Sequence, residues 1–463
     1  MTNLTVRAVA EATGGQLVSN GADVRIEGFC TDSRTLQPGD LFVPLRGPRF
    51  DGHDFLAQVA QAGAAACLSE EMVGGLPIPV VQVSDTLRAL GDLGEMVRNR
   101  FSGPVIGITG TSGKTTTKEM LAAILARTGE GLKSAGNFNN MIGVPLTLFR
   151  LKPEHRWAVI EMGMSERGEI ARLTEIVHPE IGVITNVGRA HLETLGSIDA
   201  VARAKGELFA NLPAGGTALV NADDAHVVRL PVANGVKTML FGCSAKAQIR
   251  AEQVTARNGA VEFRLNVDES SRLVRLPLPG RHNVMNALAA AAAARALEVS
   301  VDDIVAGLEA FSPCPGRMEL VELAGDILIL NDSYNANPLS ARAALDALYD
   351  LGTAGHRLAL LGDMLELGAA APELHHEVGR MAAKCVDGLF LFGDLAGELG
   401  RGAAEAGLDA DKIIVGKTHA EIADRIRQRL RAGDRLLVKG SRGMQLEKVV
   451  NLLKPSEHKS GTD

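Results

Sequence analysis

Short apolar runs alternate with segments of helical spacing along the middle of this 463-residue chain. An alternation of this kind predicts a mostly parallel sheet that is covered by helices. The strand-like runs of this region are 104–108, 157–161, 181–186, 217–221 and 238–241. The pattern changes between 248 and 278, where short alternating segments surround Asn258-Gly259, a strong hairpin signal. We therefore expect a small antiparallel extension of the central sheet.

The same alternation occurs toward both ends of the chain. The strand-like runs are 24–29, 41–45, 65–68 and 80–83 near the N-terminus, and 327–330, 358–361, 388–392, 413–415 and 436–438 toward the C-terminus. The segment Ser312-Pro313-Cys314-Pro315-Gly316 marks a break, because prolines and glycine interrupt regular structure. An Ala-rich run before it, 287–297, has the character of a buried helix.

Length supports more than one domain, since a domain has roughly 150 residues. We predict an α/β fold with three domains and a disordered tail. They are a small α/β N-terminal domain (1–84), a central P-loop mononucleotide-binding parallel-sheet domain (85–313), a C-terminal Rossmann-like open-sheet domain (314–455) and the tail (456–463).

Composition narrows the class of protein. Apolar residues make up 46% of the chain, which allows sizeable cores, and the net charge of −7 argues against nucleic acid or membrane bound by bulk electrostatics. The five cysteines form no C-x-x-C pair, so we expect neither a zinc site nor a disulfide framework. The N-terminus does not resemble a signal peptide, and no apolar run is long enough to span a membrane. We expect a cytoplasmic protein without membrane insertion.

A glycine-rich segment, Thr109–Thr117, lies between a strand-like run and a helical run. Backbone N–H groups at such a turn hold phosphate; Lys114 would reach the outer phosphates, and Thr115 would bind Mg²⁺. The loop is shorter than the common form, because position 108 is isoleucine instead of glycine. The alternative is a simple turn between strand and helix, but the spacing favours a nucleoside triphosphate.

Three further candidates follow in the central region. Glu161 ends a strand-like run, where a carboxylate faces the crevice of a parallel sheet, and His191 follows the next run. Lys205 lies in the helix that the pattern predicts at 198–211. Each has a plainer interpretation as a surface glutamate, a structural histidine or a solvated lysine.

Two asparagine-rich segments and two N-terminal loops are candidate ligand contacts. Asn137, Asn139 and Asn140 form one cluster, and 331–338 forms the other. Turn chemistry is the alternative for both. The arginines of 31–34 and 46–53 could meet a diphosphate in bidentate fashion.

Together these residues resemble the Mur ligase family, the ATP-dependent peptide ligases of peptidoglycan synthesis. The resemblance spans essentially the whole chain. It rests on 110–115, Glu161, His191, Lys205, 280–283, Asn286, 315–317 and Asp332. Within the family, 136–140, 331–338, 362–368 and 438–442 resemble the members that add D-alanyl-D-alanine to UDP-N-acetylmuramoyl-tripeptide. The family members that add the third peptide residue are the alternative, although their Asp-Asn-Pro-Arg segment is absent. A nucleotide-driven switch is a rival of another class, but its Asn-Lys-x-Asp segment is also absent.

The resemblance implies a role for each matching residue. Catalytic roles fall to Lys114, His191, Lys205 and Arg317, and ATP would contact Gly110, Thr111, Ser112, Gly113, Lys114, Thr115, Thr116, Asn286, Arg317, Asp332 and Tyr334. Two Mg²⁺ ions would be held by Thr115, Glu161, His191 and Lys205, the last as a carbamate. Substrate would contact Ser33, Arg34, Arg49, Asn137, Asn139, Asn140, Asn335, Lys439, Ser441 and Arg442. We expect a monomer whose partners are small-molecule substrates.

Overall fold

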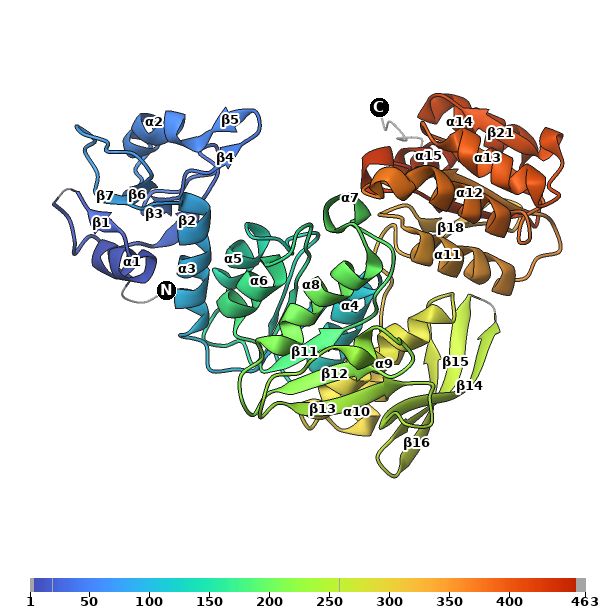
Figure 1. Cartoon of the computed structure of the whole chain (residues 1–463), viewed down its shortest axis with the longest axis horizontal. Coiled ribbons are helices and arrows are strands. Elements are labelled where there is room, and N and C mark those ends of the chain that lie inside the picture. Colours follow the sequence, from blue (N-terminus) through green and yellow to red (C-terminus); the bar gives the residue numbers. More distant parts are fainter. Residues whose placement is uncertain (1–3, 19, 258, 455–463) are drawn as a thin grey trace, which may run out of the picture.

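The computed structural model describes residues 4–18, 20–257 and 259–454. Three α/β units follow one another along the chain, and the first and third rise from the same side of the central one (Figure 1). The predicted tail 456–463 and the hairpin residue Asn258 lie outside the described residues. Among the described helices, none is long and apolar enough to cross a membrane.

The N-terminal unit is built on a five-stranded sheet in the order β1-β7-β6-β3-β2. Its strands are parallel except for β1. The elements are α1 (Val6–Thr13), β1 (Gln16–Leu17), β2 (Gly28–Cys30), β3 (Asp40–Phe42), the hairpin β4 (Arg46–Gly47) and β5 (Phe50–Asp51), α2 (Leu56–Gln61), β6 (Ala66–Ser69) and β7 (Val80–Gln82).

Helix α3 (Thr86–Arg98) connects the N-terminal unit to the central one. Leu90 and Leu93 belong to the N-terminal core, whereas Gly91 and Gly94 face the central helices, where a Cβ would meet Ile176 and Pro145. The rings of Phe29 and Phe149 also stack across this boundary, with centroids 3.9 Å apart. One helix therefore packs against both units, which ties the orientation of the first unit to the second.

The central unit contains a nine-stranded sheet in the order β16-β15-β14-β13-β12-β11-β8-β10-β9. Strands β8 to β14 form parallel pairs, and β15 and β16 extend the sheet in antiparallel fashion, which confirms the predicted extension. The strands are β8 (Val105–Thr109), β9 (Leu132–Lys133), β10 (Ala158–Glu161), β11 (Ile181–Ile184), β12 (Thr217–Asn221), β13 (Lys237–Gly242), β14 (Ile249–Arg257), β15 (Ala260–Val267) and β16 (Ser270–Leu276).

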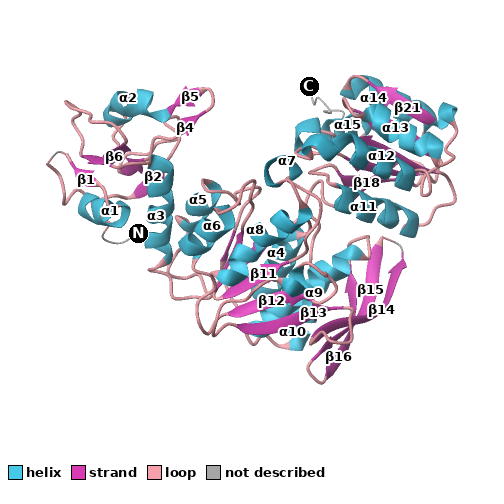
Figure 2. Ribbon diagram, in the orientation of Figure 1, coloured by secondary structure: helices cyan, strands magenta, loops and turns pink. Residues whose placement is uncertain are grey.

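Helices cover both faces of this sheet (Figure 2). They are α4 (Lys114–Leu125), α5 (Gly143–Leu148), α6 (Glu169–Val177), α7 (Leu192–Leu195), α8 (Ile198–Ala210), α9 (His282–Ala296) and α10 (Val301–Glu309). The alanine run of α9 is fully buried and packs against α4 and β13, because small side chains allow close approach. The predicted buried helix is confirmed.

The C-terminal unit has a six-stranded sheet in the order β17-β18-β22-β19-β20-β21. All five predicted strands are present, and the antiparallel edge strand β17 was not predicted. The elements are β17 (Glu319–Leu323), β18 (Ile327–Asp332), α11 (Pro338–Asp350), β19 (Arg357–Gly362), α12 (Ala371–Ala382), β20 (Gly388–Phe392), α13 (Ala396–Glu405), β21 (Ile413–Gly416), α14 (His419–Arg429), β22 (Arg435–Lys439) and α15 (Glu447–Leu453).

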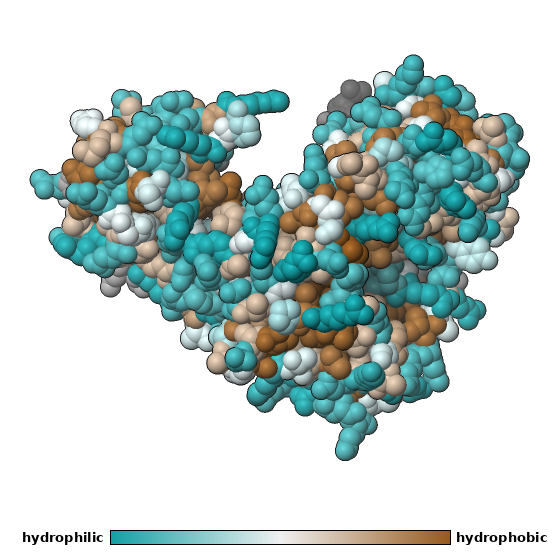
Figure 3. Space-filling view, viewed as in Figure 1, coloured by the Kyte–Doolittle hydropathy of each residue, from teal (hydrophilic) through white to brown (hydrophobic). Residues whose placement is uncertain are grey.

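The strand order of the central sheet brings the candidate residues to one edge of that sheet. In the central sheet β8 lies between β10 and β11, so the chain leaves β8 toward one side and later returns to the other. Ligands bind at the carboxyl ends of strands where the order reverses in this way. The loops after β8, β10 and β11 meet there. A hollow separates the N-terminal and C-terminal units above this region (Figure 3).

Candidate functional site

At two positions, the loop between β8 and α4 has a backbone conformation and surroundings that suit only glycine. Gly110 has a φ of 149° and Gly113 a φ of 83°. A Cβ on Gly110 would lie 1.9 Å from Thr185 Oγ1, and a Cβ on Gly113 would lie 2.1 Å from Asn286 Oδ1. Helix α4 begins directly after this loop at Lys114. The N-terminus of α4 therefore presents its free N–H groups to the cavity beside the loop, a geometry suited to phosphate.

Polar groups at the end of β11 hold the loop in place. The Ser112 N–H donates to Asn186 Oδ1 at 2.9 Å, and Asn186 Nδ2 donates to Ser112 O at 3.1 Å. The Thr185 hydroxyl donates to Ser112 O at 2.6 Å. Thr185 and Asn186 were not assigned a role from the sequence, although their position at a strand end in this sheet was an available signal.

Thr115 and Glu161 are brought together at the start of α4 and the end of β10. The Thr115 hydroxyl donates to Glu161 Oε2 at 2.8 Å, and Asn139 Nδ2 donates to Glu161 Oε1 at 2.9 Å. Glu161 is 2% exposed. A buried carboxylate beside a threonine hydroxyl at a phosphate loop is a donor set that fits Mg²⁺. The described residues contain no cluster of three or more His, Cys, Asp or Glu side chains that could hold a metal, so phosphate oxygens and water would have to complete the coordination.

Two lysines lie close to this site. Lys114 Nζ donates to the carbonyl of Gly110 at 2.7 Å. Burial lowers the pKa of Lys114, and the Arg317 charge acts in the same direction, whereas Glu161 opposes it. Lys205 is 1% exposed. Burial, aided by the nearby Lys114 charge, holds the pKa of Lys205 well below its usual range.

Lys205 is not the solvated lysine of the plainer interpretation. Within the described part of the chain, its ammonium makes no hydrogen bond and no ion pair. An unpartnered buried ammonium is costly, which favours its neutral, nucleophilic form.

His191 faces the C-terminal unit. It has a φ of 52°, precedes α7, and its Nδ1 lies 2.7 Å from Glu366 Oε2. This contact lowers the pKa of Glu366. No hydrogen bond or ion pair among the described residues joins His191 to Lys205 or to Glu161.

A cavity of about 730 Å³ connects the central and C-terminal units. This volume is in the range of small-molecule sites. It is lined by predicted residues of both units, namely Thr111, Ser112, Gly113, Lys114, Thr115, Thr116, Asn139, Glu161, Asn286, Arg317, Asp332, Tyr334, Asn335 and Lys439. The other predicted residues do not line it, namely Gly110, Ser33, Arg34, Arg49, Asn137, Asn140, His191, Lys205, Ser441 and Arg442.

The C-terminal side of the cavity is held by an ion pair between a buried lysine and a half-buried aspartate. Lys439 Nζ contacts Asp332 Oδ2 and donates to the carbonyl of Asn335 at 3.0 Å. The Arg317 guanidinium lies 4.0 Å from the centre of the Tyr334 ring, and that of Arg442 lies 5.7 Å from it. Both distances are typical of cation–π contacts. Tyr334 therefore links two arginines that the sequence placed near the phosphates and the substrate.

Ser441 and Asn337 each make a hydrogen bond that joins two loops at the cavity. The Ser441 hydroxyl donates to the carbonyl of Ala336 at 3.2 Å, which ties the loops after β22 and β18 together. Asn337 Nδ2 donates to Ser112 Oγ at 3.2 Å, a direct bond from the C-terminal unit to the phosphate loop. The second bond joins residues from two different units at the cavity.

The three asparagines after β9 differ in their surroundings. Asn139 binds Glu161, as described above. Asn140 Oδ1 accepts hydrogen bonds from the N–H groups of Ile142 and Gly143, at 3.2 and 2.8 Å, and so supports the start of α5. Asn137 is exposed. Turn chemistry thus accounts for the Asn140 side chain in this structure.

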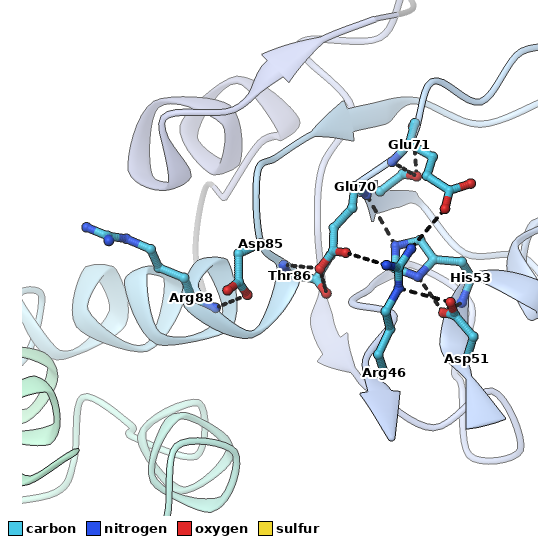
Figure 4. A network of polar contacts seen from close by, with 9 residues as sticks. Arg46, Asp51, His53, Glu70, Glu71, Asp85, Thr86 and Arg88 are labelled. Atoms are coloured by element: carbon cyan, nitrogen blue, oxygen red, sulfur yellow. Dashed lines mark hydrogen bonds and ion pairs between the residues drawn. The ribbon is translucent and has the colours of Figure 1, made fainter. Parts of the chain in front are cut away.

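The N-terminal arginines also differ in their partners. Arg34 binds Asp32 through two nitrogens, and this hydrogen bonding lowers the pKa of Asp32 to about 2. Arg46 lies between Asp51, Glu70 and Glu71 (Figure 4). Arg49 is exposed and has no hydrogen-bonding or ionic partner among the described residues. Of these three guanidinium groups, only that of Arg49 has no carboxylate partner.

The Arg46 cluster also connects the β4–β5 hairpin to α3. Glu70 Oε1 accepts hydrogen bonds from the N–H and the hydroxyl of Thr86, at 2.9 and 3.0 Å. His53 contacts Asp51 through Nδ1 and accepts the Glu70 N–H through Nε2 (Figure 4). The hairpin is therefore anchored to the helix that also packs on the central unit.

Comparison with known families and structures agrees with this geometry. Residues 108–294 match the Mur ligase middle domain, 316–442 match the glutamate ligase domain of Mur ligases, and 25–95 match the domain described as Mur ligase family, catalytic domain. The UDP-N-acetylmuramoyl-tripeptide–D-alanyl-D-alanine ligase of Escherichia coli K12 is 39% identical, over 98% of this chain and 99% of its own. The enzyme of the same name from Bacillus subtilis 168 is 35% identical, over 97% and 98%.

Solved structures show the same arrangement. MurF from Acinetobacter baumannii has a TM-score of 0.90 at 35% identity, covering 97% of this chain and 98% of that one. MurF ligase from Thermotoga maritima in complex with ADP has a TM-score of 0.82 at 30% identity, covering 93% and 97%. Since the likeness extends over nearly the full length in sequence and in structure, the chain belongs to the Mur ligase family.

Proposed function

We infer that this protein is an ATP-dependent ligase that joins D-alanyl-D-alanine to UDP-N-acetylmuramoyl-tripeptide in peptidoglycan precursor synthesis. The observation that carries this inference is the cavity in which the phosphate loop and Glu161 face Asp332 and Lys439 of another domain. Relatives of this named activity match almost the whole chain. Within this proposal, 1–84 bind the uridine nucleotide, 85–313 bind ATP, and 314–455 bring the dipeptide.

The ATP phosphates would lie on the loop that begins at Gly110. Its N–H groups from Thr111 to Thr116 and the Lys114 ammonium supply the positive groups that the β- and γ-phosphates need. Asn286, packed against Gly113, would contact adenine, and Asp332 the ribose hydroxyls. Arg317 and Tyr334, stacked on each other, would complete the nucleotide site.

Thr115 and Glu161 would hold one Mg²⁺, which would neutralise charge on the phosphates during transfer. His191 and Lys205 would serve a second Mg²⁺, and Lys205 would do so as a carbamate. The lowered pKa of Lys205 supports this modification, because the neutral amine is the form that attacks CO₂. A carbamate would also turn an amine that has no partner among the described residues into an anionic ligand.

The substrates would meet between the domains. Ser33, Arg34 and Arg49 would contact the uridine diphosphate, and Asn137, Asn139 and Asn140 the peptide. Asn335, Lys439, Ser441 and Arg442 would contact the acyl-phosphate and the incoming dipeptide. Arg49 is the best placed of the N-terminal arginines to meet a diphosphate, because its guanidinium has no competing carboxylate among the described residues.

The chemistry proceeds in two displacements. A carboxylate oxygen of the tripeptide attacks the γ-phosphorus of ATP, and the bond from that phosphorus to ADP breaks. The amine of D-alanyl-D-alanine, after losing a proton, then attacks the acyl carbon and expels phosphate, which forms the amide. The positive groups of the loop and Arg317 stabilise the charge on the transferred phosphoryl group. We further propose a cytoplasmic monomer.

One assay tests this function. Phosphate release from ATP is measured with UDP-N-acetylmuramoyl-tripeptide, with and without D-alanyl-D-alanine. We expect release to require both substrates. If a single amino acid added to the UDP-dipeptide supports release and D-alanyl-D-alanine does not, the third-residue-adding activity replaces this proposal. Release that needs neither acyl donor nor amine would instead indicate a nucleotide-driven switch.

A further inference from the structure

Lys118 is a fully buried charged residue on α4 with no role in the chemistry above. Its side chain is 0% exposed. It lies one helical turn after Lys114 and Thr115, on the helix that carries the phosphate site. An ammonium in the protein interior is costly unless its hydrogen bonds and charge are matched. Its partners therefore indicate why a lysine is accommodated there.

Three groups surround the Lys118 ammonium. It donates to the carbonyl of Ser134 at 2.7 Å and lies 3.0 Å from Glu119 Oε1. It also lies 3.9 Å from Glu161 Oε2. Among the described residues it is the one cation within ion-pair distance of Glu161. Lys118 thus connects Ser134, at the start of the loop after β9, to the carboxylate of Glu161, the candidate metal ligand.

Ser134 and Asn139 tie the same loop to the end of β10. The Glu161 N–H donates to the Ser134 hydroxyl at 3.0 Å, while Asn139 Nδ2 donates to the Glu161 carboxylate. The Gly163 N–H donates to the carbonyl of Asn139 at 2.6 Å. The segment 134–139 is therefore attached to β10 at both ends, and Lys118 supports the end at Ser134.

We propose that Lys118 is a positioning residue that holds the 134–140 loop and the Glu161 carboxylate in one shared arrangement. A single buried ammonium then fixes the positions of two groups. They are the carboxylate that would bind Mg²⁺ and the asparagines that would contact the peptide. This inference deepens the proposed function and rests on it for the roles of Glu161 and Asn139. The structural link itself is independent of that function.

The test compares Lys118→Met with Lys133→Met. Methionine fills the lysine volume without its charge or donors. Lys133 is a matched control, because its ammonium also pairs with Glu119 but makes no hydrogen bond or ion pair, among the described residues, with Ser134 or Glu161. Hydrogen exchange of the free protein is measured for peptides covering 134–140 and 160–164. We expect exchange of the Glu161 and Gly163 amides to rise about tenfold or more in Lys118→Met, and to remain unchanged in Lys133→Met.

Kinetics and stability give the second readout. We expect kcat/KM for the UDP-tripeptide to fall about tenfold or more in Lys118→Met, with Mg²⁺-free ADP affinity within about twofold of the parent. The thermal midpoint should fall, because removing one partner of a buried ion pair leaves the Glu161 carboxylate without its cation. Ser134→Ala removes the hydroxyl but keeps the carbonyl, and its effect should be non-additive with that of Lys118→Met.

Three results would overturn the proposal. One is unchanged exchange in the loop, and a second is unchanged kcat/KM. The third is exchange that becomes faster by the same factor along all of α4 as in the loop, since that would mean that Lys118 only stabilises the fold. If the parent protein shows no substrate-dependent phosphate release, the proposed function fails, while the exchange data still decide the role of Lys118.

Discussion

Asn286 Oδ1 occupies the space that a side chain at residue 113 would require. A Cβ on Gly113 would lie 2.1 Å from it, although the two residues come from opposite ends of the central domain sequence. The first turns of α9 thus lie in direct contact with the phosphate loop. This contact makes the loop conformation and the candidate adenine residue dependent on each other.

We expect Gly113→Ala to weaken ADP binding by about tenfold or more, because the clash adds to the cost of a positive φ, roughly 1–2 kcal/mol for a non-glycine residue. Isothermal titration calorimetry measures this. Gly136→Ala is the control, since Gly136 has a φ of 51° and nothing within 4 Å of its Cβ position. Equal losses in the two variants would mean that the Asn286 contact is unimportant.

Glu161→Gln should raise the Mg²⁺ concentration needed for half-maximal activity by about tenfold or more, because it removes the buried negative charge that favours the cation. The amide retains an oxygen that can accept the Thr115 hydrogen bond, so the fold should be preserved. A Mg²⁺ titration of phosphate release measures the shift. Glu193→Gln, in an exposed glutamate, should leave the titration unchanged, and an unshifted Glu161→Gln curve would remove Glu161 from the metal site.

Lys205→Ala should lose most activity, on the order of a hundredfold or more, if a carbamate is a metal ligand. Short carboxylic acids should restore part of it by occupying the vacated space. Carbon-13 NMR of the parent protein in labelled bicarbonate should show a carbamate carbon that is absent from the variant. Lys237→Ala, in an exposed lysine on β13, serves as the control. Full activity of Lys205→Ala would exclude the carbamate role.

Stability should fall as the pH drops from about 6.5 toward 4, in part because of His282. Burial lowers the pKa of His282 from 6.5 to about 4. Between these values the unfolded chain binds more protons than the folded one, so protonation favours unfolding, and the effect is complete below the folded pKa. Urea midpoints at pH 7 and pH 4.5 measure the loss. His282→Gln should reduce the pH dependence, although His375, whose pKa is also lowered by burial, contributes in the same direction. If the pH dependence of the urea midpoint is the same in His282→Gln as in the parent, His282 does not contribute to it.

Arg49→Ala should raise KM for the UDP-linked substrate about tenfold or more, because a charge-assisted hydrogen bond to phosphate contributes about 1.5–3 kcal/mol. KM for ATP should not change. Arg88→Ala is a suitable control, since Arg88 points away from the Arg46 cluster near the hairpin (Figure 4). Steady-state kinetics on both variants decide whether Arg49 contacts the substrate. If KM for the UDP-linked substrate is the same in Arg49→Ala and Arg88→Ala, Arg49 does not contact it.

Much of the fold was predictable because parallel strands buried on both faces are continuous apolar runs. The C-terminal strand at Gly388–Phe392 has the predicted bounds, and the antiparallel extension lies where the alternation changed. The edge strand β17 and the hairpin β4–β5 were missed. Their residues are mostly half-buried or exposed, so they leave no apolar run to detect. The boundary at 84 remains a prediction, since α3 packs against both the N-terminal and the central unit.

The sequence by itself determined the phosphate loop and the position of Glu161, because both depend on local order: a strand, a turn and a helix start. Only the tertiary structure decided that Lys118 and Lys205 are buried, that Glu366 faces His191, and that Arg49 has no carboxylate partner among the described residues. These outcomes depend on segments far apart in the chain. A lysine in a helix has the same local pattern whether it is solvated or enclosed, and its chemistry follows from what packs around it.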